Sequence, residues 1–396
     1  MKKKITFLPL LLSYPLSIAG TILYSFGLNW ILLSMTKSTT SFGLISAITS
    51  GSLLIFNLFG GGIADIYSRK KIMMLSDLLS ATVLIISAIF ILLDIHHMVV
   101  VLAVVGIVNS FSLALMSPAM RAFIPVVIPD EDDRSNYNSI QSGMVSIVKI
   151  AVPLVGGILI NLKFMTLLNL LLLNGISFFA SFLLIYVTKS NEKTTPVQGR
   201  VELRKLLASV VDGIKWVKQH NQIKILILAV AIFNFFSEGY TLTLPFLIKE
   251  NFFGADISYS NLILFESIGG VLGSFMYVFS KKKGGHWSLA LAGFSILAMV
   301  LLNRGYFVYC FSFLVGISIT YFNIYFVSKL QKDVEQEFMG RVFSVVYIAA
   351  ALLVPVADLL FGTCIPNLRE KSLILIGVGV SLLPFILQYV DKKKVN

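Results

Sequence analysis

Three charged side chains, Lys149, Glu238 and Glu266, stand within long apolar stretches of the sequence. A lysine at the centre of a bilayer costs about 2.5–3.5 kcal/mol even on a lenient insertion scale, so Lys149 should have a partner or contact water. A carboxyl group in the same surroundings can bind a proton or a cation. We therefore expect Glu238, and after it Glu266, to bind protons or cationic substrates. The alternative is that one of them only neutralises Lys149.

The surroundings of Glu238 favour a functional role. Asn234, Glu238 and Thr241 are spaced by four and three residues, so they share one face of a helix. Aromatic residues flank this face: Phe233, Phe235, Phe236 and Tyr240. An acidic group that aromatic rings shield from water suits proton binding and also suits pairing with a cationic drug.

Membrane-spanning helices are needed to position these residues. Of the 396 residues, 57% are hydrophobic and 13% are charged, and the mean hydropathy is +0.87. This composition excludes a soluble globular protein, whose surface would need far more charge. Twelve apolar segments are long enough to cross a hydrocarbon core of about 30 Å. They lie near residues 8–34, 41–63, 72–93, 98–120, 138–161, 164–187, 222–249, 258–280, 286–303, 305–328, 339–363 and 371–390.

The basic residues indicate how these segments are oriented. With twelve spans, 25 of the 32 Lys and Arg residues fall on one side of the membrane and six on the other, and the last one is Lys149. By the positive-inside rule both termini are cytoplasmic. The net charge of +12 is thus explained by topology, and we expect no nucleic-acid partner.

The halves of the chain resemble each other and are joined by a charged segment. Residues 189–221 contain structure-breaking residues and then apolar positions at helical spacing among basic ones, which predicts an amphipathic helix on the cytoplasmic face. We expect an N-terminal six-helix bundle over 1–188, this linker over 189–221, and a C-terminal six-helix bundle over 222–396. Internal repeats with a central linker are a transporter architecture.

Residues that could bind a metal or a cofactor are scattered. Cys310 and Cys364 lie in separate predicted helices, and the four histidines fall near helix ends. The acidic run Asp130–Asp133 lacks the spaced oxygens and glycine of a calcium loop. We therefore expect no metal site, no disulfide, no cofactor and no catalytic residues.

The stretch from Gly60 to Lys71 is the glycine-rich, charged junction of the first quarter of the chain, and it contains Asp65, Arg69 and Lys70. It resembles the loop between helices 2 and 3 of the major facilitator superfamily, G-x-L-A-D-R-x-G-R-K. Ile66 and Ser68 depart from that pattern, which has Arg and Gly there. In that family, the acidic and basic residues form a charge cluster with the start of helix 11, and the cluster breaks and re-forms as the transporter changes conformation.

Other motifs narrow the resemblance. Pro153-x-x-Gly156-Gly157 resembles half of the antiporter motif of superfamily exporters, although Val152 replaces one of its glycines. With Ser117-Pro118-Ala119 and Gly340-Arg341-Val342-Phe343-Ser344, the chain looks like the macrolide-efflux branch of the bacterial drug:proton antiporters.

The resemblance implies an all-α major facilitator fold in the bacterial cytoplasmic membrane. It implies an exporter of amphipathic compounds that works by alternating access and is driven by protons. Separately, we expect a monomer, with sodium ions as the alternative to protons. The family fold places Lys149 opposite Glu266, although Glu238 is a competing partner. We expect Tyr24, Asn109, Asn234, Glu238 and Tyr321 to line the central cavity. For conformational gating we expect Asp65, Arg69, Lys70, Pro153, Gly156, Gly157, Arg341 and Asp358, the last in an extracellular gate.

Three other functions stay open at this point. The same fold could import or flip a peptide, a sugar or a lipid, and the direction of flux would decide. A membrane-embedded acyltransferase would need histidines or carboxylates gathered at one membrane face. A non-transporting sensor would bind a compound without moving it.

Overall fold

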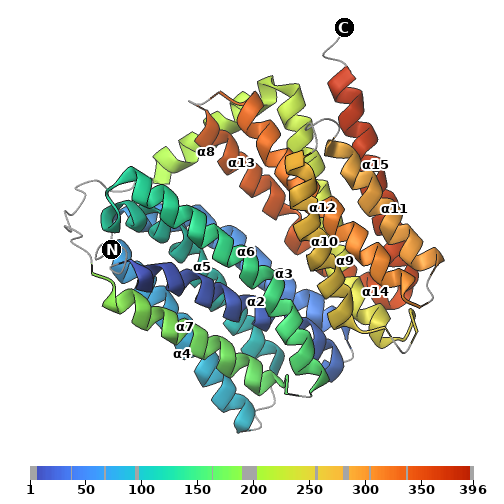
Figure 1. Ribbon diagram of the computed structural model, residues 1–396, viewed down its shortest axis with the longest axis horizontal. Helices are drawn as coiled ribbons and strands as arrows, with labels where there is room; N and C mark the ends of the chain where they lie inside the picture. The colour runs from blue at the N-terminus through green and yellow to red at the C-terminus, as the bar shows by residue number, and fades with distance from the viewer. Residues whose placement is uncertain are drawn as a thin grey trace. The chain divides into compact units, whose positions relative to one another are not determined.

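The computed structural model of the protein describes residues 7–36, 38–66, 68–93, 98–162, 164–189, 203–254, 257–279, 285–302, 305–335 and 338–392. Within these ranges every regular element is a helix and no strand occurs. Figure 1 shows the helices in chain order, from blue at the N-terminus to red at the C-terminus. The expected all-α class is therefore confirmed.

The chain divides into two compact units. The first comprises Met1–Met35 and Ile48–Leu206, and the second comprises Thr36–Ala47 and Leu207–Asn396. One helix, Thr39–Ile66, therefore begins among residues of the second unit and continues in the first. The division expected from the sequence, 1–188, 189–221 and 222–396, stays a prediction.

The first half of the chain forms six long helices. They are α2 (Leu8–Thr36), α3 (Thr39–Ile66), α4 (Arg69–Leu92), α5 (Met98–Val127), α6 (Glu131–Asn161) and α7 (Leu167–Val187). Short polar side chains begin two of them: Ser68 accepts from the backbone N–H of Lys71 at 3.4 Å, and Thr166 accepts from that of Asn169 at 3.2 Å. Both are N-caps that satisfy a free donor at the start of a helix.

The second half begins with the predicted amphipathic helix, α8 (Leu203–Gln219). The helices that follow are α9 (Asn221–Lys249), α10 (Tyr259–Phe279), η1 (Gly285–Trp287), α11 (Ser288–Leu301), α12 (Phe307–Asp333), α13 (Met339–Leu352), α14 (Val354–Leu368) and α15 (Glu370–Lys392). The sequence predicts one helix over 339–363, whereas the structure interrupts it at Leu353. Pro355 explains the break, because proline has no backbone N–H to continue the ladder.

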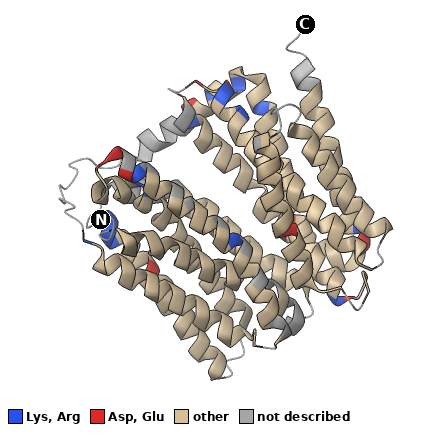
Figure 2. Ribbon diagram, viewed as in Figure 1, with Lys and Arg blue, Asp and Glu red and all other residues tan. Residues whose placement is uncertain are grey.

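Ten helices in the described part of the chain are long and apolar enough to cross a membrane, with α13 and α14 taken as one. The protein is therefore a multi-pass membrane protein. The expected spans near 258–280 and 286–303 correspond to α10 and to the shorter apolar segment Gly285–Leu301, which are not among the ten. A count of twelve spans stays a prediction for these two. Figure 2 shows charged residues mostly at helix ends and in connections, with few inside the helices.

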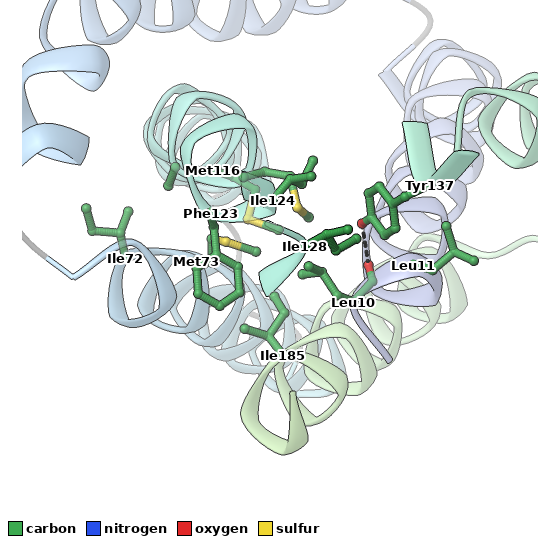
Figure 3. Packing of buried hydrophobic residues seen from close by; sticks show 12 residues of the cluster. Leu10, Leu11, Ile72, Met73, Met116, Phe123, Ile124, Ile128, Tyr137 and Ile185 are labelled. Atoms are coloured by element: carbon green, nitrogen blue, oxygen red, sulfur yellow. Dashed lines mark hydrogen bonds between the residues drawn. The ribbon is translucent and has the colours of Figure 1, made fainter. Parts of the chain in front are cut away.

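The first unit has a packed core where several helix ends meet. Leu10 of α2, Met73 of α4, Phe123 of α5 and Ile185 of α7 are all fully buried in it. The hydroxyl of Tyr137 in α6 donates to the backbone carbonyl of Leu10 at 3.3 Å, as Figure 3 shows. A buried tyrosine of this kind needs such a partner, because an unpaired hydroxyl in apolar surroundings is costly.

In the second unit, the start of α3 touches α14 without intervening side chains. A Cβ atom on Gly362 would lie 2.7 Å from the Cα of Gly43 and 3.1 Å from the carbonyl oxygen of Thr39. The hydroxyl of Thr40 donates to the carbonyl of Gly362 at 3.4 Å. Small residues allow this backbone approach, as in many membrane helix pairs.

Candidate functional site

The two acidic residues expected in separate roles, Glu238 and Asp358, meet in the second unit. Glu238 lies in the middle of α9, and its carboxyl group is within hydrogen-bonding reach of that of Asp358 in α14. Asp358 is 1% exposed. Glu238 is half-buried. Two acids placed in this way can bind a proton or a cation.

Close packing holds α9 against α14 around this pair. A Cβ atom on Gly239 would lie 2.5 Å from the ring of Phe361, so only glycine fits there. The rings of Phe235 and Phe361 have centroids 5.4 Å apart. Whether Phe233, Phe235, Phe236 and Tyr240 shield the Glu238 face, as expected, stays a prediction.

Glu266 lies on α10 and has a different partner. The hydroxyl of Tyr240 in α9 lies 3.3 Å from Glu266 Oε2 and donates to it. The same hydroxyl also interacts with Ser312 of α12. The backbone of Glu266 is packed tightly as well, because its Cα would be only 3.0 Å from a Cβ on Gly316. Glu266 is thus fixed by α9, α10 and α12 together.

Asn234 joins α9 to the interruption between α13 and α14. Its Nδ2 donates to the carbonyl of Ala350 at 3.0 Å. Ala350 belongs to the last turn of α13, where carbonyls lose their regular partners. The asparagine therefore replaces a backbone donor that the break at Leu353 removes.

The remaining residues expected to line a cavity lie on three helices. Tyr321 of α12 makes an edge-to-face contact with Tyr277 of α10, with centroids 5.2 Å apart. Tyr24 of α2 is 7% exposed, and its hydroxyl has no hydrogen-bond partner among the described residues. The same holds for the side-chain oxygen of Asn109 in α5. Their joint lining of a cavity stays a prediction.

Lys149 is an exposed residue of α6. It belongs to the first unit, whereas Glu238 and Glu266 belong to the second. Pairing of Lys149 with either acid therefore stays a prediction. Within the second unit, the acids have the partners described above.

The charged junction between α3 and α4 is described in part. Lys70 Nζ donates to the carbonyls of Tyr186 at 2.9 Å and Thr188 at 2.8 Å, at the end of α7. A cation at this place satisfies free carbonyls and complements the helix dipole. The side chain of Asp65 lies outside the described residues. Arg69 is half-buried at the start of α4.

The other expected gating residues take part in helix packing. Pro153, Gly156 and Gly157 are buried on α6. A Cβ on Gly156 would lie 2.7 Å from the ring of Phe26 in α2. Arg341, at the start of α13, stacks its guanidinium 5.3 Å from the ring centroid of Phe338. Their part in gating stays a prediction.

One buried acid was not among the residues expected to carry function. Asp77 of α4 is 1% exposed, and α7, which packs against α4, carries the fully buried Ser181. The signal in the sequence is the spacing of Asn174, Ser177 and Ser181 by three and four residues, which places a polar stripe on α7. Within the described ranges, no group of three or more His, Cys, Asp or Glu residues could hold a metal ion.

The sequence is similar to a protein family and to individual transport proteins. The model of the Major Facilitator Superfamily matches residues 10–357. Macrolide efflux protein A of Streptococcus pyogenes is 23% identical over 345 residues, which cover 83% of this chain and 82% of that protein. The Staphyloferrin A transporter of Staphylococcus aureus is 21% identical over 388 residues, which cover 94% and 93%.

The fold is also similar to solved structures. A bacterial homologue of the iron transporter ferroportin, in its inward-facing state, has a TM-score of 0.77 at 15% sequence identity. The match covers 97% of this chain and 98% of that one. At this identity the likeness concerns the fold alone.

Proposed function

The chain belongs to the major facilitator superfamily and is a transporter rather than an enzyme, and we propose that it exports amphipathic small molecules in exchange for protons. The observation that carries this proposal is the carboxyl group of Glu238, held in mid-helix against Asp358 in a membrane-spanning segment. An ionisable residue at such a place is expensive, and it marks an ion or substrate pathway.

The relatives support the export direction and the substrate class. Proteins named for macrolide efflux are 23–24% identical to this chain. A macrolide-like or other amphipathic drug is therefore our first candidate substrate. The buried Pro153, Gly156 and Gly157 of α6, which resemble half of an exporter motif, support the same direction.

The mechanism follows from moving a proton one way and the drug the other. Glu238 takes up a proton from outside and gives it up inside, while the transporter alternates between two openings. A membrane potential supplies about 2.3 kcal/mol per elementary charge per 100 mV. Exchange of a proton for a neutral drug therefore uses both the potential and the pH gradient.

The location and topology belong to the same proposal. We place the protein in a bacterial cytoplasmic membrane as a monomer with both termini in the cytoplasm. The uneven distribution of Lys and Arg between the two ends of the helices supports this orientation.

Efflux from cells tests the proposal. Cells with the intact chain, with Glu238→Gln or with Glu250→Gln are loaded with macrolides and fluorescent cations, with and without an uncoupler. Glu250 is a matched control, because it follows the same helix and is exposed. We expect uncoupler-sensitive efflux from the intact chain and Glu250→Gln, and loss of efflux in Glu238→Gln. Full efflux by Glu238→Gln would remove this residue from the mechanism and direct attention to Glu266.

A second candidate is export of an anionic compound, and the observation that favours it is Lys149. This cation is exposed within a membrane-spanning segment of α6. The Staphyloferrin A transporter matches more of this chain than the macrolide exporters do. An anionic substrate would predict that Lys149→Gln abolishes its transport and spares that of neutral drugs. Flux measured in vesicles of known orientation would reveal an importer or a flippase instead.

A further inference from the structure

The carboxyl groups of Glu238 and Asp358 approach each other from two helices in apolar surroundings. Asp358 is 1% exposed, and the ring of Phe361 packs on Gly239 beside the pair. Two carboxylates at hydrogen-bonding reach repel each other if both are charged. A single proton placed between them removes the repulsion and forms a hydrogen bond, as in dyads of acidic residues.

Among the described residues, no cation acts on Glu238. Asp358 is the titratable side chain that acts on Glu238 among the described residues. On α10, Glu266 accepts from Tyr240. The start of α3 brings Thr40 and Gly43, which are uncharged.

On the other helices around α9 and α14, the described titratable side chains stand at helix ends or have other contacts. On α15, Gly379 packs against the ring of Phe236, while Glu370 and Lys371 stand at the beginning of that helix. Arg341 of α13 contacts Phe338 at the helix start, and Tyr347 of α13 is 63% exposed. Tyr321 of α12 is in contact with Tyr277.

We propose that Glu238 and Asp358 form one proton-binding site that holds a single shared proton, and that this proton keeps α14 against the start of α3. The proposal deepens the function proposed above, since it gives the coupling proton a site made of two residues. It also assigns Asp358, expected as part of a gate, to proton binding.

The link to α3 comes from the position of Asp358 on α14. Asp358 lies one turn before Gly362, the residue whose backbone touches Gly43. Its own backbone carbonyl also lies against Gly43. When the proton leaves, repulsion between the two carboxylates pushes α14 away from α9 and disturbs the contact with Gly43. Binding and release of the proton are thereby coupled to the packing of two membrane helices.

Infrared spectroscopy of the purified full chain in lipid nanodiscs tests the shared proton. At about pH 7 we expect Glu238→Gln and Asp358→Asn each to remove the same protonated-carboxyl band, because in each variant an amide N–H donates in place of the proton. The double variant should lose no more than either single one. Glu266→Gln is the matched control and should retain this band.

Each other result overturns the proposal. Losses that add up in the double variant would mean two separate protons, and no loss in either variant would mean none. If Asp358→Asn fails to fold, Glu238→Gln decides alone, since a band that persists would show that Asp358 holds its own proton. These measurements need no transported substrate. Failure of drug export would therefore leave the proton site standing, and the reverse also holds.

Thiol labelling tests the link to α3. Thr39→Cys, at a position that is 1% exposed beside Gly362, is introduced into a chain with Cys310→Ser and Cys364→Ser, and its labelling rate is compared at the same pH with that in a chain also carrying Glu238→Gln and Asp358→Asn. The amide pair cannot become charged, so we expect equal rates at about pH 5 and at least about threefold faster labelling of the carboxyl pair at about pH 9. Equal rates at both pH values would overturn the coupling.

Discussion

Arg369 binds Glu250 directly beyond the ends of α14 and α9, with Nη2 3.2 Å from Oε2. This ion pair lies about three helical turns beyond Asp358 and Glu238 on the same two helices. The helices therefore run alongside each other in the same direction and are joined at two levels. The inner contact joins two acids, Glu238 and Asp358, beside the ring of Phe361. The outer contact is the exposed ion pair of Glu250 and Arg369.

The outer level should contribute little to stability. The side chains of Arg369 and Glu250 are 54% and 46% exposed, and exposed pairs are worth at most about 1 kcal/mol. We expect Arg369→Gln to lower the free energy of unfolding by less than that, and by less still at high salt. Denaturant unfolding in detergent measures it. A loss of several kcal/mol would contradict the exposure of the pair.

The contact of α3 with α14 should not tolerate a methyl group. Gly362→Ala would place a Cβ 2.7 Å from the Cα of Gly43, and overpacking of this kind costs about 1–3 kcal/mol. We expect a lower melting temperature in a thermal unfolding experiment. Gly143→Ala on α6 is the matched control, because no atom lies within 4 Å of a Cβ there. Equal stability of the two variants would show that the helices separate easily.

Tyr240 and Glu266 should be coupled energetically. Tyr240→Phe removes the hydroxyl that lies 3.3 Å from Glu266 Oε2, and a hydrogen bond to a charged group is worth about 1.5–3 kcal/mol. In a chain with Glu266→Gln, the same substitution should cost less. A double-mutant cycle on unfolding free energies gives the interaction directly. Additive losses would mean that Tyr240 acts through Ser312 instead.

Lys70 should stabilise the end of α7. Lys70→Met removes two donors, to the carbonyls of Tyr186 and Thr188, and should increase amide hydrogen exchange in the last turn of that helix. The expected cost is about 1 kcal/mol. Lys71→Met is the control, because Lys71 is exposed. Equal amide exchange in both variants would mean that Lys70 does not stabilise the end of α7 and serves only to orient the helices in the membrane.

The helices could be predicted from the sequence because length and apolar composition determine a membrane span. The predicted segment 222–249 agrees closely with α9, Asn221–Lys249, and the amphipathic pattern from Leu203 onward predicted α8. The interruption at Leu353 was missed. Pro355 was visible in the sequence, but a proline can also be accommodated in a continuous membrane helix, as Pro153 is in α6.

The contacts between side chains were less predictable, because apolar length does not fix the rotation of a helix about its axis. The sequence placed Glu238 among Phe233, Phe235, Phe236 and Tyr240, and the shielding of its carboxyl group by these rings stays a prediction. It could not show that Asp358 faces Glu238, since the two residues are distant in the chain and each looked like an isolated charge. Lys70, likewise, was expected in a charge cluster, and it binds backbone carbonyls whose position depends on how α7 ends.

The break at Leu353 divides one membrane span into two helices that are attached to different parts of the second unit. The first, α13, is attached to α8, because a Cβ on Gly213 would lie 2.6 Å from the carbonyl oxygen of Arg341. The second, α14, carries Asp358 and Gly362. A continuous rod would transmit every tilt of one end to the other. Because Asn234 donates to the carbonyl of Ala350 at the break, we expect α14 to tilt without disturbing the contact of α13 with α8.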